Sequence, residues 1–178
     1  VVMEIDIPQS FEISLQSIEK MKKLLYIISS STPFKPNIVK LSEKIGATRN
    51  TVKTYLHYLE RAKIIQLLQS DTKGVSILQK PEKIYFHHPN LMYAFASEKS
   101  NIGTIRETFF YNQVGASENL TSSKRADFIV NDKYTIEVGG KNKDKSQISG
   151  IENAFIAADN IEHGFGNKIP LWLFGFLY

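Results

Sequence analysis

The stretch that most constrains the fold is RADFIVNDKYTIEVGGKNK, residues 125–143, in which two alternating apolar runs flank the turn-forming pair Asn131-Asp132. This pattern predicts a β-hairpin. A two-residue loop would mix polar and apolar residues on both faces of the hairpin, whereas a three-residue loop, 131–133, gives one continuous apolar face. The three-residue register is therefore predicted. Its apolar pairs are Phe128–Ile136, Val130–Tyr134 and Ala126–Val138.

The same register places Asp127 opposite Glu137 on the other face of the hairpin. Opposed carboxylates about 5 Å apart repel by roughly 3 kcal/mol at an effective dielectric constant of ~20. A divalent cation, a shared proton or a nearby ammonium group would offset that repulsion, and Lys141 has the strand parity to reach the same face. If this face is exposed instead, water screens the two charges and no site forms.

Positive charge is concentrated in residues 35–80, which contain nine Lys and Arg residues against three Asp and Glu, although the net charge of the chain is only +4. Such a segment is the expected electrostatic footprint of a protein that binds a phosphate backbone, although Lys-rich surfaces also favour solubility. The absence of cysteine excludes disulfides and Cys-ligated zinc. Because no signal peptide and no apolar run of ~20 residues is found, a cytoplasmic location without membrane contact is expected.

Apolar residues at helical spacing predict three helices in the N-terminal part of the chain. The first spans residues 14–28, the second runs from Pro36 to Gly46, and the third is capped by Thr48. The third helix is expected to bury Val52, Tyr55, Leu56 and Leu59. A hairpin is predicted next, with strands at 64–69 and 75–78 around the turn 70–74.

This order resembles the winged helix-turn-helix family, whose second core helix presents base-reading residues from its first turns. Many such domains mediate protein contacts only, so DNA and protein partners both stay open at this point. The residues expected to contact duplex DNA are Arg49, Asn50, Lys53, Thr54 and His57 on the helix, and Lys73 in the wing.

After Pro81 the pattern predicts a strand at 83–87, a short helix from Pro89, and a helix over 102–114. Glu107 in the last helix is an acid of the site, a solvated side chain, or a partner for Arg106 or Lys124. The apolar ending 169–178 is expected to be buried or docked, as a strand followed by a helical turn. The expected domains are residues 1–80 and 81–178. The apolar stripe predicted for the helix over 102–114 consists of Ile102, Ile105, Phe109 and Val114.

Four stretches resemble the C-terminal half of bacterial and archaeal AAA-type ATPases: KPEKIYFHHPNLMYAF, NIGTIRETFFYNQV, RADFIVNDKYTIEVGGKNK and IPLWLFGFLY. In that family a P-loop ATPase precedes a winged helix and a domain similar to PD-(D/E)XK nucleases. The resemblance implies an α+β chain, with an N-terminal winged helix-turn-helix and a small α/β domain whose mixed sheet is restriction-endonuclease-like. It also implies an ATPase domain ahead of Val1, which alone would bind ATP, since no Gly-rich phosphate loop occurs in these residues.

In nucleases of that fold, carboxylates bind Mg²⁺ and a lysine stabilises charge on the phosphate. The resemblance implies Asp127 and Glu137 as Mg²⁺ ligands, Lys141 as the lysine, and Glu107 as an additional acid. The motif places its lysine two residues after the acid, where this chain has Gly139, so Lys141 lies about 6.8 Å further along the strand unless a bulge brings it back.

A degenerate catalytic site is therefore expected. The leading hypothesis is a non-catalytic, DNA-binding and regulatory region of an AAA-type ATPase. Two alternatives are an active Mg²⁺-dependent endonuclease and a stand-alone winged-helix transcription regulator. The oligomeric state is left open by the sequence.

Overall fold

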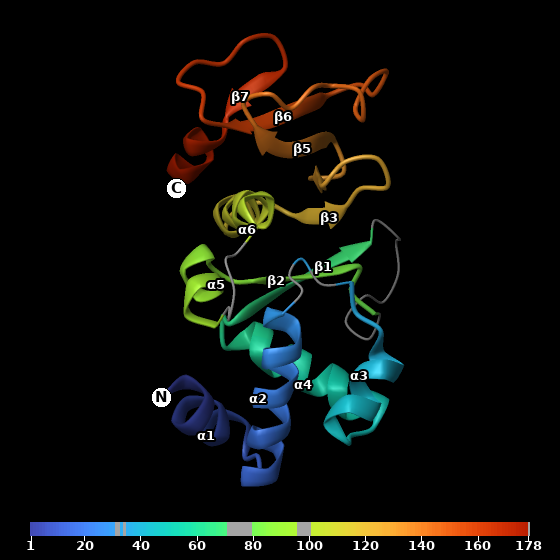
Figure 1. Cartoon of the computed structure of the whole chain (residues 1–178), viewed down its shortest axis with the longest axis vertical. Coiled ribbons are helices and arrows are strands. Elements are labelled where there is room, and N and C mark those ends of the chain that lie inside the picture. Colours follow the sequence, from blue (N-terminus) through green and yellow to red (C-terminus); the bar gives the residue numbers. More distant parts are fainter. Residues whose placement is uncertain (31–32, 34, 71–79, 96–100, 178) are drawn as a thin grey trace. The chain divides into compact units, whose positions relative to one another are not determined.

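The computed structural model describes residues 1–30, 33, 35–70, 80–95 and 101–177 (Figure 1). The chain divides into two compact units, one formed by Val1–Leu67 and Ile77–Lys99, the other by Leu68–Ser76 and Ser100–Tyr178. The expected boundary after residue 80 falls inside the first unit. The described residues contain helices and seven strands with both parallel and antiparallel pairing, so the expected α+β class with mixed strand pairing is confirmed.

The first unit is mainly helical. Its predicted helices are confirmed to within about two residues, and the strand and short helix expected after Pro81 are also found. In chain order its elements are η1 (Val2–Asp6), α1 (Ile7–Phe11), α2 (Leu15–Ser29), α3 (Ile38–Ile45), α4 (Arg49–Arg61), the first half of β1 (Ile65–Ser70), β2 (Lys83–Phe86) and α5 (Pro89–Phe95).

Local signals determine where α3 and α4 begin and end. Asn37 accepts a hydrogen bond from the backbone N–H of Lys40, and Thr48 accepts one from Thr51, each at 3.1 Å, so both helices have a side-chain N-cap. Gly46 ends α3 in the left-handed conformation with φ of 62°, as predicted. The helix α3 starts later than expected because Asn37 caps it.

One apolar core joins α2, α3 and α4, and β1 leads away from it. The four residues predicted to form the inner face of α4 are all buried. The strand β1 lies beside β2, where the His87 N–H donates to the carbonyl of Ile64 at 2.9 Å. The returning strand 75–78 and Lys73, predicted for the wing, lie outside the described residues. The core residues of α2, α3 and α4 are Ile18, Met21, Leu24, Leu25, Ile28, Ile38, Leu41, Ile45, Val52, Tyr55, Leu56 and Leu59.

The second unit combines the helix α6 and the short 3-10 helix η3 with a mixed sheet (Figure 1). The strand β4 pairs antiparallel with β3 and β5, whereas β6 is parallel to both β5 and β7. The end of β1 pairs parallel with β3. The elements are α6 (Ile102–Val114), β3 (Leu120–Ser122), β4 (Phe128–Val130), β5 (Tyr134–Gly140), β6 (Ala154–Asp159), β7 (Lys168–Pro170) and η3 (Leu171–Phe176).

The β4–β5 hairpin has the predicted register, with Phe128 opposite Ile136 and Val130 opposite Tyr134. Its loop is the predicted segment 131–133, in which Asn131 and Asp132 have φ of 52° and 55°. Asn and Asp tolerate this left-handed region better than most residues. The third predicted pair, Ala126 with Val138, lies beyond β4, which begins at Phe128.

Two predictions about apolar faces need correction. In α6 the buried residues are Thr104, Thr108, Phe110 and Val114, whereas Ile102 is 55% exposed. The ring of Phe110 decides the face, because it packs between the rings of Phe128 and Phe174, with centroids 5.3 and 4.8 Å away. The C-terminal segment is a strand and a helical turn as predicted, but only part of it is buried. Its exposed apolar residues are Trp172, Leu173, Phe176 and Leu177.

In the first unit, Glu60 of α4 joins the helix to β1. Its Oε1 accepts a hydrogen bond from the backbone N–H of Leu67 at 3.1 Å. Burial raises the pKa of Glu60 above its usual 4.5, although that hydrogen bond and the charges of His57 and Lys63 oppose the rise. A raised pKa means that the stability contribution of Glu60 is complete at pH values below the unfolded-state pKa and decreases as pH rises through the folded-state pKa.

We predict that Glu60→Gln, which keeps an acceptor for Leu67 and removes the charge, is at least as stable as wild type at pH 7. Its stability should also vary less with pH between 4 and 7. Glu60→Ala leaves that N–H without its acceptor and should be about 1–3 kcal/mol less stable than Glu60→Gln. Urea denaturation across this pH range measures both effects. If Glu60→Gln and Glu60→Ala are equally stable, the backbone contact does not matter.

Candidate functional site

A carboxylate lies buried in the middle of the second unit. Glu137 is on β5, between β4 and β6, and is only 3% exposed. The ammonium group of Lys143 is 2.5 Å from its Oε1. Asp127, half-buried just before β4, accepts a hydrogen bond from the Val138 N–H at 2.9 Å through Oδ2. These contacts bring together two acids and one lysine, which we call the acid–lysine cluster: Asp127, Glu137 and Lys143.

Gly139 makes room for the lysine. After β5 the chain turns tightly, and the Lys143 N–H donates to the carbonyl of Gly140 at 2.9 Å. The Lys143 side chain then runs back over the strand, since a Cβ atom at Gly139 would lie 2.8 Å from both its Cβ and Cγ atoms. No side chain fits there while Lys143 occupies this position. Gly139 therefore lets Lys143, four residues later, reach Glu137.

The electrostatics of Lys143 connect all three members of the cluster. Burial by itself lowers the pKa of Lys143. The hydrogen bond to Glu137 and the charges of Glu137, Asp127 and Asp144 outweigh that effect and raise the pKa above its usual 10.5. The contribution of this lysine to stability is thus complete at neutral pH and is lost only as the pH rises through that raised value.

The remaining residues expected at the site are Lys141 and Glu107. Lys141 is exposed, and its carbonyl accepts a hydrogen bond from Lys168 Nζ at 2.9 Å. Glu107 is half-buried on α6. Within the part of the chain that the structure describes, no group of three or more His, Cys, Asp or Glu residues could hold a metal ion, so Glu107 does not complete such a group.

Sequence reasoning did not single out Lys143. Strand parity selected Lys141, but parity holds only along an extended chain, and β5 ends at Gly140. The signal that could have found Lys143 is Gly139, which has no side chain to block the passage of a long one. The repulsion between Asp127 and Glu137 is thus offset by an ammonium group, one of the three means considered from the sequence.

The residues that could hold Mg²⁺ are Asp127 and Glu137. One or two carboxylates are sufficient for Mg²⁺ in proteins, because water and substrate phosphates complete its coordination. The donor set therefore fits Mg²⁺, but Lys143 contacts one oxygen of Glu137 directly, and a cation there would have to displace that ammonium group.

In the first unit, α4 presents polar residues on the side opposite its buried stripe. Arg49, Asn50, Thr54 and His57 are exposed, and the Thr54 hydroxyl donates to the Asn50 carbonyl at 3.1 Å. Lys53, also expected to contact DNA, is half-buried. Five of the six predicted DNA-contacting residues thus lie on one helix, and the sixth, Lys73, is not among the described residues.

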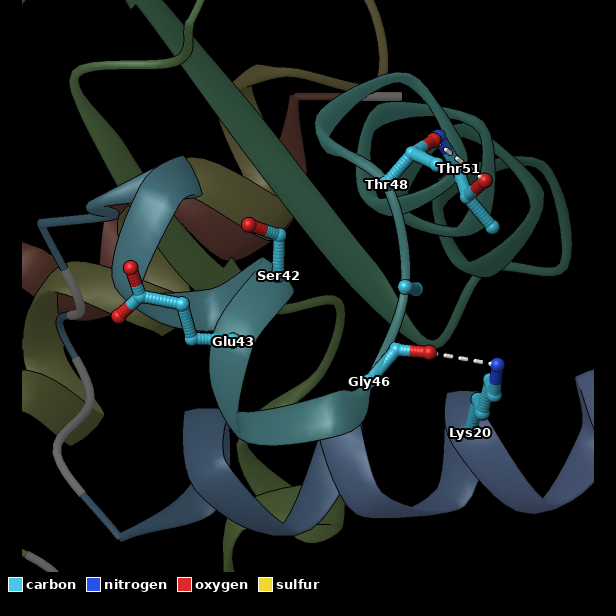
Figure 2. Close-up of a pocket in the computed structure, with 7 residues that line it drawn as sticks. Lys20, Ser42, Glu43, Gly46, Thr48 and Thr51 are labelled. Carbon is cyan, nitrogen blue, oxygen red and sulfur yellow. Dashed lines mark hydrogen bonds between the residues drawn. The ribbon is translucent and has the colours of Figure 1, made fainter.

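Figure 2 shows the turn that leads from α3 into α4. Lys20 of α2 donates a hydrogen bond from Nζ to the carbonyl of Gly46 at 2.6 Å, so α2 contacts the turn directly. A hollow of about 450 Å³ lies beside this contact. The contact therefore links α2 to the turn before α4. The hollow is lined by Lys20, Ser42, Glu43, Gly46, Ala47, Thr48 and Thr51.

Together these features define a two-unit α+β protein with a helix–turn–helix pair in one unit and an acid–lysine cluster in the sheet of the other. Residues 2–101 match the family model described as "Domain of unknown function (DUF8612)", and the chain belongs to that family. The match ends close to Lys99, where the first unit ends. Searches of curated proteins and of solved structures gave no match. Among the described residues no helix has the length and apolar character to cross a membrane.

To test the ion pair, we predict that Lys143→Met lowers the free energy of unfolding at pH 7 by about 1–3 kcal/mol, because Glu137 then keeps a buried acceptor without its ammonium partner. Adding Glu137→Gln should restore most of that loss. Acidification should stabilise the single variant as the carboxylate becomes protonated.

The control is Lys145→Met, which removes an exposed lysine from the same loop and should change stability little. A thermodynamic cycle from urea denaturation measures the coupling between Lys143 and Glu137. Additive effects of the two substitutions would show that the contact is not energetically significant.

Proposed function

We propose that this chain binds duplex DNA through α3, the turn and α4, arranged as a winged helix-turn-helix, and that its second unit is a nuclease-like domain with a scaffold or regulatory role. The observation that supports DNA binding best is the outward face of α4. Arg49 and Asn50 stand in its first turn and Thr54 one turn later, where a recognition helix reads base edges.

The charge distribution supports the same proposal. Residues 35–80 carry a positive excess, and phosphate contacts from Lys and Arg supply most of the affinity of non-specific DNA binding. Arg and Asn are also the side chains that most often read guanine and adenine in the major groove. The regulatory role of the second unit depends on the resemblance to AAA-type ATPases and supposes an ATPase as its partner.

We predict that the protein binds a short duplex with a log–log salt slope of about −4 to −5, the value for four to six phosphate contacts. Arg49→Ala should weaken binding by about 1–3 kcal/mol if Arg49 reads a base, or reduce the slope by about one if it contacts a phosphate. Fluorescence anisotropy at several salt concentrations measures both quantities.

Lys23→Ala, an exposed site on α2, removes one positive charge elsewhere in the first unit and serves as the matched control. Equal loss of binding by Lys23→Ala and Arg49→Ala would indicate an unspecific effect of charge. If duplex DNA does not bind at low salt, the proposal fails.

A second candidate function is Mg²⁺-dependent hydrolysis of phosphodiesters, and the position of Lys143 favours it. The sequence lacked a lysine at the motif position, but the structure brings an ammonium group to Glu137 from six residues further along. In such a site Asp127 and Glu137 would hold Mg²⁺, which supplies Lewis-acid polarisation of the phosphate when bound. Lys143 would stabilise negative charge on the phosphoryl oxygens.

We predict for this candidate that the protein nicks supercoiled plasmid in the presence of Mg²⁺ or Mn²⁺, and that Glu137→Gln and Lys143→Met abolish nicking. The expected loss exceeds a hundredfold, as for removal of a group that stabilises transition-state charge. Agarose gel electrophoresis measures the rate, and circular dichroism checks that each variant is folded.

The matched control is Asp132→Asn, which converts an exposed acid in the same hairpin to its amide and should leave nicking unchanged. If wild type and Glu137→Gln nick equally, the activity belongs to a contaminant or to another site.

A further inference from the structure

A second feature of the second unit is a pocket of about 550 Å³ beside the acid–lysine cluster. Three of the residues that line it carry positive charge, two are amides and one is glycine, and no acidic side chain is among them. We call it the cationic pocket. Its lining residues are Arg106, Gly140, Lys141, Asn142, Lys143 and Asn160.

The side chain of Arg106 on α6 is held in place by Asp159. Its Nε donates to Oδ2 of Asp159 at 2.9 Å, and its side chain is only 16% exposed. Asp159 in turn accepts a hydrogen bond from the Asn160 N–H at 2.8 Å. Because only Nε is engaged by Asp159, the paired terminal nitrogens of the guanidinium group are left as donors, and no described residue accepts from them.

Gly140 forms the wall on which this guanidinium group lies. A Cβ atom at Gly140 would be 3.2 Å from Nη1 and 3.4 Å from Nη2 of Arg106, so the glycine lets the group lie close to the backbone. The neighbouring Lys141 is held through its backbone, since Lys168 donates to its carbonyl. The Lys141 ammonium group forms no ion pair with any described residue.

The two acids near the pocket each contact one of its cations. Asp159 contacts Arg106 and Glu137 contacts Lys143, so each acid orients a cation and neither lines the pocket. An arginine fork, a lysine and amide donors form the donor set that matches a phosphate group. None of the lining residues is aromatic, which argues against recognition by stacking on a base. The volume exceeds that of a bare phosphate and is sufficient for the attached sugar.

We infer that the cationic pocket binds a phosphate group of a nucleic-acid strand, with the terminal nitrogens of Arg106 and the ammonium group of Lys141 as its principal donors. This inference rests on the proposed function, namely that the chain binds nucleic acid. It adds a contact in the second unit that is separate from α4. A phosphate in the pocket would hold a strand next to Asp127 and Glu137.

The test is an NMR titration of the full ¹⁵N-labelled chain with three probes: inorganic phosphate, the dinucleotide dTpdT, and its 5′-phosphorylated form pdTpdT. The amide signals of Gly140, Lys141 and Asn142 are expected to shift on addition of pdTpdT. Lys141→Ala should weaken this binding roughly fivefold to tenfold, the range for losing a charged donor at an exposed site. Lys145→Ala, which removes an exposed lysine outside the pocket, should leave it unchanged.

The three probes separate the source of the phosphate. Equal affinity for dTpdT and pdTpdT shows recognition of an internal phosphodiester, whereas binding of pdTpdT and inorganic phosphate alone shows recognition of a terminal phosphate. Either result supports the pocket. The inference is overturned if none of the probes shifts these amides, or if Lys141→Ala and wild type bind equally.

The variant Arg49→Ala distinguishes failure of the pocket from failure of the proposed DNA binding through α4. This substitution changes the exposed face of α4 and should reduce binding of duplex DNA while leaving the shifts of Gly140, Lys141 and Asn142 unchanged. If duplex binding through α4 fails but pdTpdT still shifts the pocket amides, the proposal for α4 is wrong and the pocket stands. The reverse outcome leaves α4 as the DNA-binding element and rejects the pocket.

Discussion

A carboxylate buried in a β-sheet needs a partner, and in this protein the partner of Glu137 is Lys143. Removing an ionised carboxylate from water costs several kcal/mol even after relaxation, and a direct ammonium contact offsets much of that cost. The contact depends on Gly139, whose missing side chain lets the lysine stem pass, and on the turn at Gly140, which reverses the chain. One ion pair thus explains Gly139 and Lys143, whereas Gly140 makes room for the guanidinium group of Arg106.

The same ion pair can stabilise the second unit whether or not the unit is catalytic. The ammonium group balances the charge of Glu137 through a direct contact at 2.5 Å. Metal binding would have to exchange one favourable contact for another. Lys143 also remains partly accessible, with its side chain 32% exposed. The arrangement is therefore compatible with a structural ion pair and with a lysine that moves to a phosphate, and the two roles differ in whether Lys143 leaves Glu137.

Features set by short-range rules could be predicted from the sequence, and those set by tertiary packing could not. The hairpin register followed from alternation, and the ends of α3 and α4 followed from Thr48 and Gly46, whose effects extend over a few residues. The predicted buried face of α6 was confirmed only at Val114, because the contacts of Phe110 with distant aromatic rings decide which side faces the core. Lys143 was missed because its position depends on a turn beyond the strand.

The two surfaces proposed to contact nucleic acid hold their cations in different ways, and this difference bears on their roles. Arg49 is an exposed side chain in the first turn of a helix, free to adjust to the groove that it enters. Arg106 is fixed by Asp159 and lies against Gly140, so its donors are oriented before any ligand arrives. Preorganised donors lose less entropy on binding and discriminate more sharply by geometry. The helix α4 is therefore suited to reading sequence along a duplex, whereas the cationic pocket is suited to holding one phosphate at a defined distance from the acids.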